Sequence, residues 1–449
     1  MGIYIRKKRA RALGIHFVFF AVSLGASCSF GQESSLRKVV SFREAIEIAV
    51  EKSPRLAPFR GDVELRELES TNSYTTFLPQ LDLSAVHGLR GASPSPYSSN
   101  LASEFNLELV ENLYDNGQSW TKYRSAKILK EIADLSFRHE RDKLTLEVSN
   151  EYMRFSLAKA LFDVQSEQFA IVNKQYQSVS SQFQQGVKTR RDYLRFKTEL
   201  RRSEIDLQTS ETAVEKSRVE LMRLMGFELA EGVPVYDFNP IQIQHEAVLK
   251  PPTSAPRVEE HFLYRISGLQ KEVFENDTRL VRRQFGPEVY LTAGAGYHTG
   301  DYLGSSVSVT SNESTSWNAL ITLKFNLLDW GTRRRNIAIA NVRQSQGESL
   351  LAVSLNSFSS DSVKLMLDLK QSTKNYALAK ELLELDSRSY GFLDTEYRNG
   401  KVTYLDIIVG LRDLLNSKVQ MYSSYFDLRT QLLRYRYYQG RLYESVVEK

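Results

Sequence analysis

Cysteine, proline and glycine are scarce in this chain of 449 residues. The single cysteine, Cys28, excludes an internal disulfide. The 11 prolines and 23 glycines are too few for a collagen-like or disordered chain. With 25% charged and 42% hydrophobic residues, the sequence is too polar for a bundle of membrane-spanning helices. We therefore expect an ordered chain of two or three structural units.

The sequence also lacks the residue patterns of metal-binding and catalytic sites. The six histidines are scattered and form no His-x-x-x-His pair. The glycines between Gly294 and Gly300 do not have the spacing of a dinucleotide-binding fingerprint, and a strand entering a loop explains them better. We predict that the protein is not an enzyme and that it binds no metal and no cofactor.

An excess of basic residues is confined to the N-terminus. The formal net charge is +5, and five basic residues between Arg6 and Arg11 precede the first acid, Glu33. Without residues 1–31 the chain has 54 basic and 54 acidic residues, because five of the 59 basic residues are removed. A nucleic-acid partner is therefore not expected.

Residues 1–31 have the organisation of a secretory signal. The basic residues are followed by the apolar segment Ile15–Leu24, which is too short to span a membrane, and then by small residues. Two processing reactions fit this pattern. Signal peptidase would cut before Gln32, whereas a lipobox-like Gly25-Ala26-Ser27 would lead to lipidation of Cys28.

The exported part consists of two similar halves. We predict a first repeat at 32–230, a linker at 231–257 that is rich in proline, and a second repeat at 258–449. Gly117 corresponds to Gly331, and Gly186 corresponds to Gly400. Both pairs are separated by 214 residues (331 minus 117 and 400 minus 186), so the internal spacing is conserved between the repeats.

Each repeat is predicted to contain one very long helix. Residues 118–185 contain neither glycine nor proline, and 332–399 contain no proline. Apolar residues recur between Phe155 and Phe183 at alternating steps of three and four, which indicates a coiled-coil seam. At 1.5 Å per residue, such a helix would extend about 100 Å.

A tight turn is predicted after each long helix. Both turns have the spacing Gly-x-x-Thr-x-x-Asp, in which glycine ends one helix and threonine caps the next. The residues are Gly186, Thr189 and Asp192 in the first repeat, and Gly400, Thr403 and Asp406 in the second. We expect the returning helices to end near Met225 and Tyr443.

Upstream of each long helix the apolar period changes to two, which predicts strands. In the last strand the apolar residues expected to face a membrane are Trp317, Ile321, Leu323 and Phe325. Each repeat supplies one hairpin, so each chain has four strands with one apolar face. Four strands cannot close a membrane barrel, which predicts an obligate oligomer. A soluble amphipathic sheet packed on a helix is the alternative.

The motifs of this chain, in their order along the sequence, resemble those of TolC-like outer-membrane factors. They are the opening segment Ser41–Ala49, Phe77-Leu78-Pro79, the junctions Asp115–Gly117 and Asp329–Gly331, and the duplicated tips. The resemblance implies an α+β, mainly α, chain that forms a homotrimer. A twelve-stranded barrel would lie in outer-membrane lipid, above a helical tunnel in the periplasm. The function implied is passive exit from a tripartite efflux pump or type I secretion system.

The resemblance also assigns roles to the helical tips. Tyr397 and Asp406 occupy the positions that line the periplasmic constriction in the family. Repeated carboxylates around a pore would raise one another's pKa and attract cations. Helix capping is the alternative role of Asp406, and Val402 and Val409 depart from the family pattern.

The turns at Gly186 and Gly400 would dock a periplasmic adaptor, which in turn engages an inner-membrane transporter. A different functional class also fits the long helices. The protein could be a structural coiled-coil tether of the envelope that has no transport activity.

Overall fold

The computed structural model describes residues 39–447, apart from 92–98, 228–235, 244–251, 253, 300, 304–308, 312–313 and 400. The chain divides into two units, Met1–Arg37 and Lys38–Lys449, and the described residues belong to the second. The proposed signal at 1–31 and Cys28 lie outside the described residues, so export and lipidation stay predictions.

The described unit is mainly helical. Its helices are α1 (Phe42–Lys52), α2 (Ala57–Thr75), α3 (Gln118–Gln184), α4 (Arg190–Leu224), α5 (Phe262–Arg283), α6 (Thr332–Arg398), α7 (Tyr404–Tyr438) and α8 (Leu442–Val447), with short 3-10 helices η1 (Pro54–Leu56) and η2 (Val258–Glu260). None of the helices in the described ranges is long and apolar enough to cross a lipid bilayer.

The internal duplication is visible in the order of elements. The first repeat runs α2, β2, β3, α3, α4, and the second runs α5, β5, β8, α6, α7, with two short strands, β6 (Asp301–Leu303) and β7 (Val309–Ser311), inserted between β5 and β8. The helices α3 and α6 both contain 67 residues, and α4 and α7 both contain 35. The predicted long helices are therefore confirmed. The predicted repeat limits at 230 and 258 stay predictions.

One predicted helix end was wrong. The returning helix α7 ends at Tyr438, not near Tyr443. Gly440 adopts a φ of +67°, and its N–H donates to the Tyr437 carbonyl at 2.8 Å. Glycine accepts this left-handed conformation readily, so the chain turns there and begins the short helix α8.

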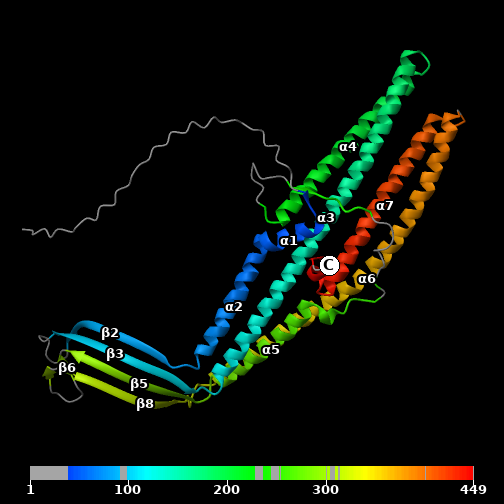
Figure 1. Ribbon diagram of the computed structural model, residues 1–449. Coiled ribbons are helices and arrows are strands. Elements are labelled where there is room, and N and C mark those ends of the chain that lie inside the picture. The colour runs from blue at the N-terminus through cyan, green and yellow to red at the C-terminus, as the bar shows by residue number, and fades with distance from the viewer. Residues whose placement is uncertain are drawn as a thin grey trace, which may run out of the picture. The chain divides into compact units, whose positions relative to one another are not determined.

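The main sheet has four antiparallel strands in the order β2-β3-β5-β8. They are β2 (Gln80–Gly91), β3 (Ser99–Tyr114), β5 (Glu288–Thr299) and β8 (Ser314–Lys324). Figure 1 places these strands at one end of the unit and the α3–α4 and α6–α7 tips at the other. Each repeat contributes one hairpin, as expected, and β3 with β5 joins the two.

The core lies where the N-terminal helix and the linker meet α3. Strand β1 (Val39–Val40) pairs in parallel with β4 (Asp237–Phe238), a part of the linker. The buried Tyr152 hydroxyl lies 3.2 Å from the Val40 carbonyl and donates to the Asn239 carbonyl at 2.6 Å. Burial raises the pKa of Tyr152, so the phenol stays protonated and remains a donor.

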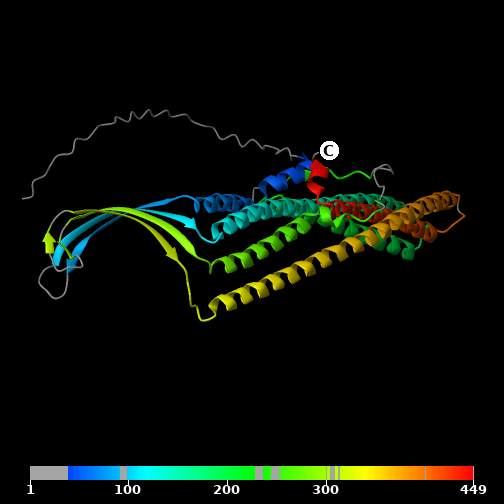
Figure 2. The ribbon, with the colours of Figure 1, turned by 90° about the horizontal axis from the view of Figure 1, so that it is seen from below.

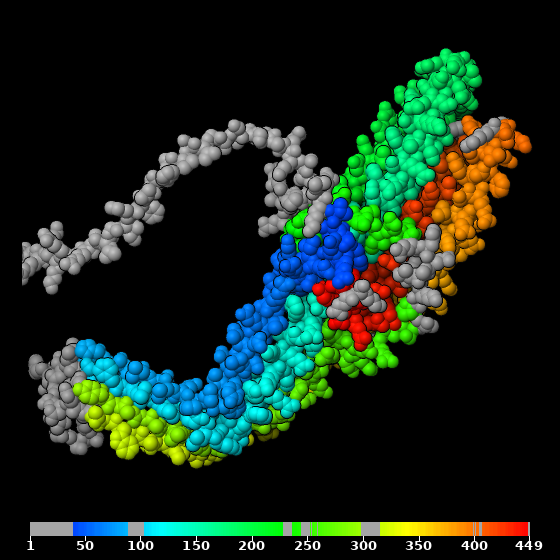
Figure 3. Space-filling view, viewed as in Figure 1, coloured from blue at the N-terminus to red at the C-terminus, as the bar shows by residue number. Residues whose placement is uncertain are grey.

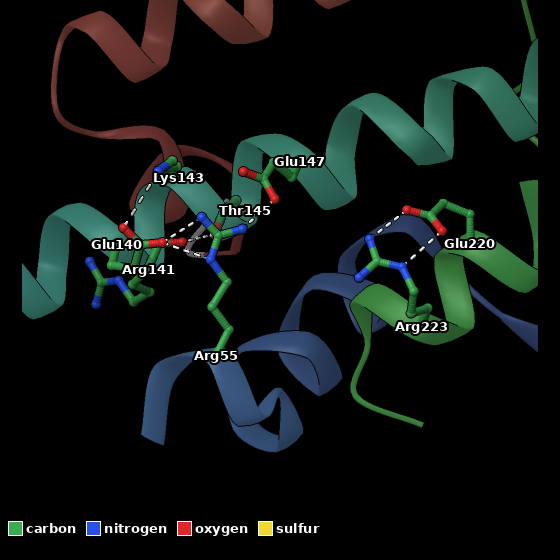
Figure 4. Close-up of polar contacts among 8 residues, drawn as sticks. All are labelled: Arg55, Glu140, Arg141, Lys143, Thr145, Glu147, Glu220 and Arg223. Atoms are coloured by element: carbon green, nitrogen blue, oxygen red, sulfur yellow. Dashed lines mark hydrogen bonds and ion pairs between the residues drawn. The ribbon is translucent and has the colours of Figure 1, made fainter. Parts of the chain in front are cut away.

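Ion pairs connect the short helix η1, near the N-terminus of the described residues, to the long helix α3. Arg55, in η1, donates to the Glu140 carboxylate at 2.7 Å (Figure 4). It also binds Glu147, which lies about two helical turns further along α3. On α4, Arg223 donates to Glu220 at 2.9 Å (Figure 4). The Arg55 contacts join elements far apart in sequence, whereas the Arg223 pair lies within a single helix.

A buried histidine, His261, and a partly buried one, His139, lie where α3, α5, α6 and α7 meet. His261 caps α5, and its Nδ1 accepts from the Leu263 N–H at 3.2 Å. Its ring centroid lies 5.3 Å from that of His139, 5.3 Å from that of Tyr437 and 4.4 Å from that of Phe358. Burial, with the nearby His139, lowers the pKa of His261 to about 3, so the ring stays neutral.

A carboxyl group near the same junction titrates in the opposite sense. Asp142 accepts from the Leu442 N–H at 3.1 Å, and burial raises its pKa to about 6. The folded state therefore binds a proton at Asp142 that the unfolded chain lacks between pH 3.8 and about 6. Across this range Asp142 increases stability as the pH falls, whereas His261 decreases it.

We predict that His261→Asn makes stability less sensitive to acid. Asparagine keeps an acceptor for the cap but does not titrate. In the wild type the unfolded His261 gains a proton below pH 6.5 and the folded one does not, so stability falls as the pH is lowered. From pH 6.5 to 5 this linkage is worth up to about 2 kcal/mol. Urea unfolding of the detergent-solubilised protein at pH 7 and 5 measures it.

Asp142→Asn is the opposing control. Because Asp142 adds stability as the pH falls, its removal should make the loss of stability on acidification larger than in the wild type. Equal pH dependence in the wild type and in His261→Asn would contradict the prediction.

Candidate functional site

The four-stranded sheet has one apolar and one polar face. Residues paired across antiparallel strands share a face. Leu81 pairs with Leu109, Leu109 with Ala293, and Ala293 with Ala319, which makes one continuous apolar row across all four strands. Further rows on this face contain Leu83, Leu107, Ala295 and Trp317, and Leu291 with Ile321.

Large apolar side chains on this face are exposed. Trp317 is 83% exposed, Ile321 is 72% exposed and Leu323 is 67% exposed. In water such a patch is unfavourable, at about 25 cal/mol for each Å² of apolar surface. Its size and continuity mark a surface that contacts lipid or another protein.

Phe325, predicted to belong to the same strand, lies one residue beyond its end. Strand β8 stops at Lys324, which pairs with Glu288, the first residue of β5. The next pair in register would place Phe325 opposite Pro287. Because proline has no N–H to donate, the ladder ends there. The phenyl ring is nevertheless exposed, like its neighbours on the apolar face.

The opposite face of the sheet is polar. Asp82 pairs with Glu108, Glu108 with Gly294, and Gly294 with Asn318. A Cβ atom at Gly294 would lie 2.9 Å from the Asn318 amide oxygen, so glycine leaves space for that side chain. The alternation has exceptions, since Glu111 falls on the apolar face opposite Leu291, and the exposed Leu320 falls on the polar face opposite Thr292.

The two outer edges of the sheet have no strand partner among the described residues. They belong to β2, of 12 residues, and β8, of 11 residues. Both strands therefore reach the roughly 9 to 11 residues that a tilted strand needs to cross a bilayer. An edge in lipid must pair, so the sheet is complete only when another chain supplies strands.

The two strand-to-helix junctions are built alike. The Asp115 carboxylate accepts from the Gly117 N–H at 3.0 Å, and the Asp329 carboxylate accepts from the Gly331 N–H at 3.0 Å. The two residues between the aspartate and the helix have positive φ in both repeats, at Asn116 and Gly117 and at Trp330 and Gly331. This conformation explains the Asp-x-Gly pattern of the sequence.

Aromatic residues gather at the first junction, a feature that the sequence analysis missed. The rings of Tyr74, Phe77, Trp120 and Tyr123 lie between 5.8 and 6.5 Å apart as neighbouring centroids. Tyr and Trp are enriched where membranes meet water. The sequence places these aromatic residues just before and just after the first two strands, which is a sign of a cluster. They come, however, from the end of α2, the turn after it and the start of α3, and the sequence does not show how these segments pack.

The first helical tip matches the predicted turn. Gly186 has a φ of +76°, and the Val187 N–H donates to the Gln182 carbonyl at 2.8 Å. The Asp192 N–H donates to the Thr189 hydroxyl at 3.2 Å, which caps α4. Hydrogen bonding by Thr189 lowers the pKa of Asp192, so this carboxylate stays ionised.

The second tip repeats this geometry. The Lys401 N–H donates to the Glu396 carbonyl at 2.9 Å, the bond equivalent to that of Val187. The Thr403 N–H donates to the Asp406 carboxylate at 2.8 Å, and the Thr403 bonds lower the pKa of Asp406. Gly400 lies outside the described residues. Tyr397, near the end of α6, is 38% exposed.

The structure thus places Asp192 and Asp406 in equivalent capping positions. Within a single chain the carboxyl of Asp406 is stabilised as an anion, which agrees with its capping role. The constriction role needs several chains around an axis and stays a prediction. Among the residues that the structure describes, no group of three or more His, Cys, Asp or Glu could hold a metal ion.

A sequence model of the outer membrane efflux protein family matches residues 45–227 and 268–423. This match covers most of both repeats and omits the linker. Among curated protein sequences, no significant match is found.

Solved structures of outer-membrane channels share the fold. The Campylobacter jejuni CmeC outer membrane channel has a TM-score of 0.78 at 15% identity, covering 96% of this chain and 94% of CmeC. The outer membrane protein VceC of Vibrio cholerae has a TM-score of 0.72 at 15% identity, covering 88% of this chain and 95% of VceC. The Neisseria gonorrhoeae MtrE outer membrane channel, in its open state, has a TM-score of 0.71 at 17% identity, covering 90% of this chain and 88% of MtrE.

We predict that lysine at position 321 prevents stable insertion into lipid, whereas lysine at the next position does not. Ile321→Lys places a charge on the apolar face, at a cost of about 2–4 kcal/mol near the centre of a bilayer. Thr322→Lys places the same charge on the polar face. The folded fraction after reconstitution into phospholipid vesicles measures the difference. Similar losses in both variants would show that the two faces are not distinguished by lipid.

Proposed function

The chain belongs to the outer membrane efflux protein family, and from this premise we propose that it is the passive exit duct of a tripartite efflux pump or type I secretion system. It is an outer-membrane channel tunnel whose helices lie in the periplasm. The observation that carries the proposal is the four-stranded sheet, which has an apolar face, a polar face and two unpaired edges.

Closure of the barrel is supported by strand arithmetic. Known membrane barrels use about eight strands or more, so one chain with four strands is insufficient. Three copies would provide twelve strands, the number that the family resemblance implies. In this assembly the apolar faces meet outer-membrane lipid and the polar faces line a lumen.

The long helix α6 offers a second surface for assembly. It runs along one margin of the helices and contacts α5 and α7 (Figure 2). Its exposed apolar residues form pairs and one triplet spaced three or four residues apart, namely Ile339 with Val342, Leu350 with Val353, Val363 with Leu367, and Leu378 with Leu382 and Leu385. A coiled-coil seam of this kind needs a partner helix, and a neighbouring copy supplies it.

The alternative of a structural tether is not favoured. A tether would use the long helices but has no need of a sheet whose second face is polar. Asp82, Glu108 and Asn318 lie on that face, where a lumen filled with water would solvate them.

The constriction is proposed at the second tip. Three copies of Asp406 around the axis would repel one another and attract cations, although Thr403 lowers the pKa of each. Tyr397, on the other side of the turn, would narrow the passage. Asp192 caps the first tip in the same way. A comparison of variants at Asp192 and Asp406 therefore distinguishes a pore role from a capping role.

Partners follow from the same function. A periplasmic adaptor would dock at the helical tips and connect them to an inner-membrane transporter, which supplies the energy. The proposed docking residues are Gly186, Thr189, Asp192 and Thr403, together with Gly400 in the part outside the described residues. The chain itself needs no cofactor in this scheme.

We predict that the protein extracted from outer membranes in mild detergent has the mass of three chains, because each sheet edge needs a strand from a neighbour. Native mass spectrometry measures this mass. Leu367→Glu with Leu378→Glu on α6 should reduce the trimer fraction, whereas Lys216→Glu on the exposed side of α4 should not. A monomeric protein would rule out the closed barrel and support the tether.

We predict that Asp406→Asn and Tyr397→Ala each raise single-channel conductance in planar bilayers, and that Asp406→Asn reduces cation preference. Asparagine preserves a capping acceptor while removing charge. Asp192→Asn is the matched control, since it alters the equivalent cap of the first repeat and should leave conductance unchanged. Equal effects of both aspartate variants would assign Asp406 to capping alone.

A further inference from the structure

A groove of about 930 Å³ lies between α4 and α7 near the two tips. Figure 3 shows these tips as separate projections at the end of the unit that is away from the strands. Four arginines of α4 line the groove, Arg190, Arg191, Arg195 and Arg202, and Arg412 lines it from α7. We propose that this groove docks an acidic amphipathic helix of the periplasmic partner.

The basic excess belongs to the first tip only. Residues 188–202 contain seven basic and two acidic residues, a net charge of +5. The equivalent segment of the second repeat, 402–416, contains Arg412 with Asp406 and Asp413, a net charge of −1. Both segments form the same turn and the same capped helix. The positive charge is therefore not required by the fold.

The position of the arginines even opposes helix stability. Arg190 and Arg191 occupy the first turn of α4, where the helix dipole is positive and cations are unfavourable. The equivalent positions of α7 are Tyr404 and Leu405, which carry no charge. A negatively charged partner would relieve this repulsion and would interact favourably with the same helix end.

Most of the groove's positive charge is uncompensated within the described residues. Glu199 accepts from Arg412 at 3.2 Å and from Arg202 at 3.4 Å, so it bridges α7 and α4. The other acid, Asp192, is occupied by its cap with Thr189. Arg190, Arg191 and Arg195 are exposed and form no ion pair with another described residue.

The groove fits a helix better than a small anion. Its α4 wall extends from Arg190 to Arg202, which is about 18 Å at 1.5 Å per residue. Apolar side chains lie between the charges, with Phe196 only 5% exposed, Leu194 half exposed and Ile408 contributed by α7. An apolar strip bordered by arginines complements an amphipathic helix with acidic borders.

This inference rests on the proposed function, because it names the chemistry of the partner that docks at the tips. The test uses the full-length protein in detergent and three labelled peptides of equal length. One is helical with a leucine face and glutamate borders, the second has lysine in place of glutamate, and the third has the acidic composition interrupted by prolines. Fluorescence anisotropy at low and high salt measures binding.

The acidic helical peptide should bind, and added salt should weaken it. Arg191→Glu with Arg195→Glu should weaken binding by about tenfold or more. The matched control is Lys197→Glu with Lys216→Glu, which changes the charge of α4 equally at exposed lysines outside the groove. This control should stay within about twofold of the wild type. Circular dichroism checks that both variants keep their helix content.

Three results would overturn the inference. They are equal binding of the lysine peptide, unchanged affinity of the arginine variant, and equal binding of the proline-interrupted peptide. The last would indicate a general surface for polyanions such as lipid headgroups. Oligomer mass and conductance of the same preparations keep the proposals apart. A conducting trimer that does not bind the acidic helix contradicts only the docking inference.

Discussion

The unpaired edges of the four-stranded sheet are the constraint on which the assembly depends. A backbone N–H or C=O without a partner costs several kcal/mol in hydrocarbon, so a sheet with an apolar outer face cannot remain open in lipid. Adjacent strands alternate in direction, and four is an even number. The edge strand β8 of one copy is therefore antiparallel to β2 of the next, and identical copies can continue the same ladder until it closes. The need for neighbouring copies therefore arises from the unpaired strand edges. The exposed apolar residues of α6 offer a second contact between the same copies.

Much of the secondary structure could be predicted because its signals are local. The long helices begin after Gly117 and Gly331 and end within one residue of the prediction, since glycine, threonine and aspartate act within a single turn. The two sheet faces were also predictable from the period of two. The end of β8 was not predictable, because it depends on Pro287, which immediately precedes the neighbouring strand β5, and neither was the turn at Gly440. The same limit applies to the aromatic cluster, the His139–His261 contact and the arginine groove, all of which join elements distant in sequence.

The duplication separates what the fold requires from what function adds. Both repeats keep the aspartate that accepts from the glycine N–H at the junction, and both keep the Thr-x-x-Asp cap at the tip. The intervening residue of the junction differs. Asparagine tolerates positive φ, whereas the bulky Trp330 does so at a cost. An exposed tryptophan beside the membrane strands gains from the interface between lipid and water, which offsets that cost.

The two tips have diverged in packing as well as in charge. Gly410 of α7 is the equivalent of Phe196 of α4, at the offset of 214 residues (410 minus 196). A Cβ at Gly410 would lie 2.4 Å from a methyl of Leu393, so the second hairpin packs α6 against α7 where the first accommodates a buried phenyl ring. The second hairpin is thus closely packed at this position, and the first is bordered by arginines. Because both tips share one cap and one turn, these differences are not required by the fold, and they agree with the roles that we propose, a constriction at the second tip and a basic docking groove that begins at the first.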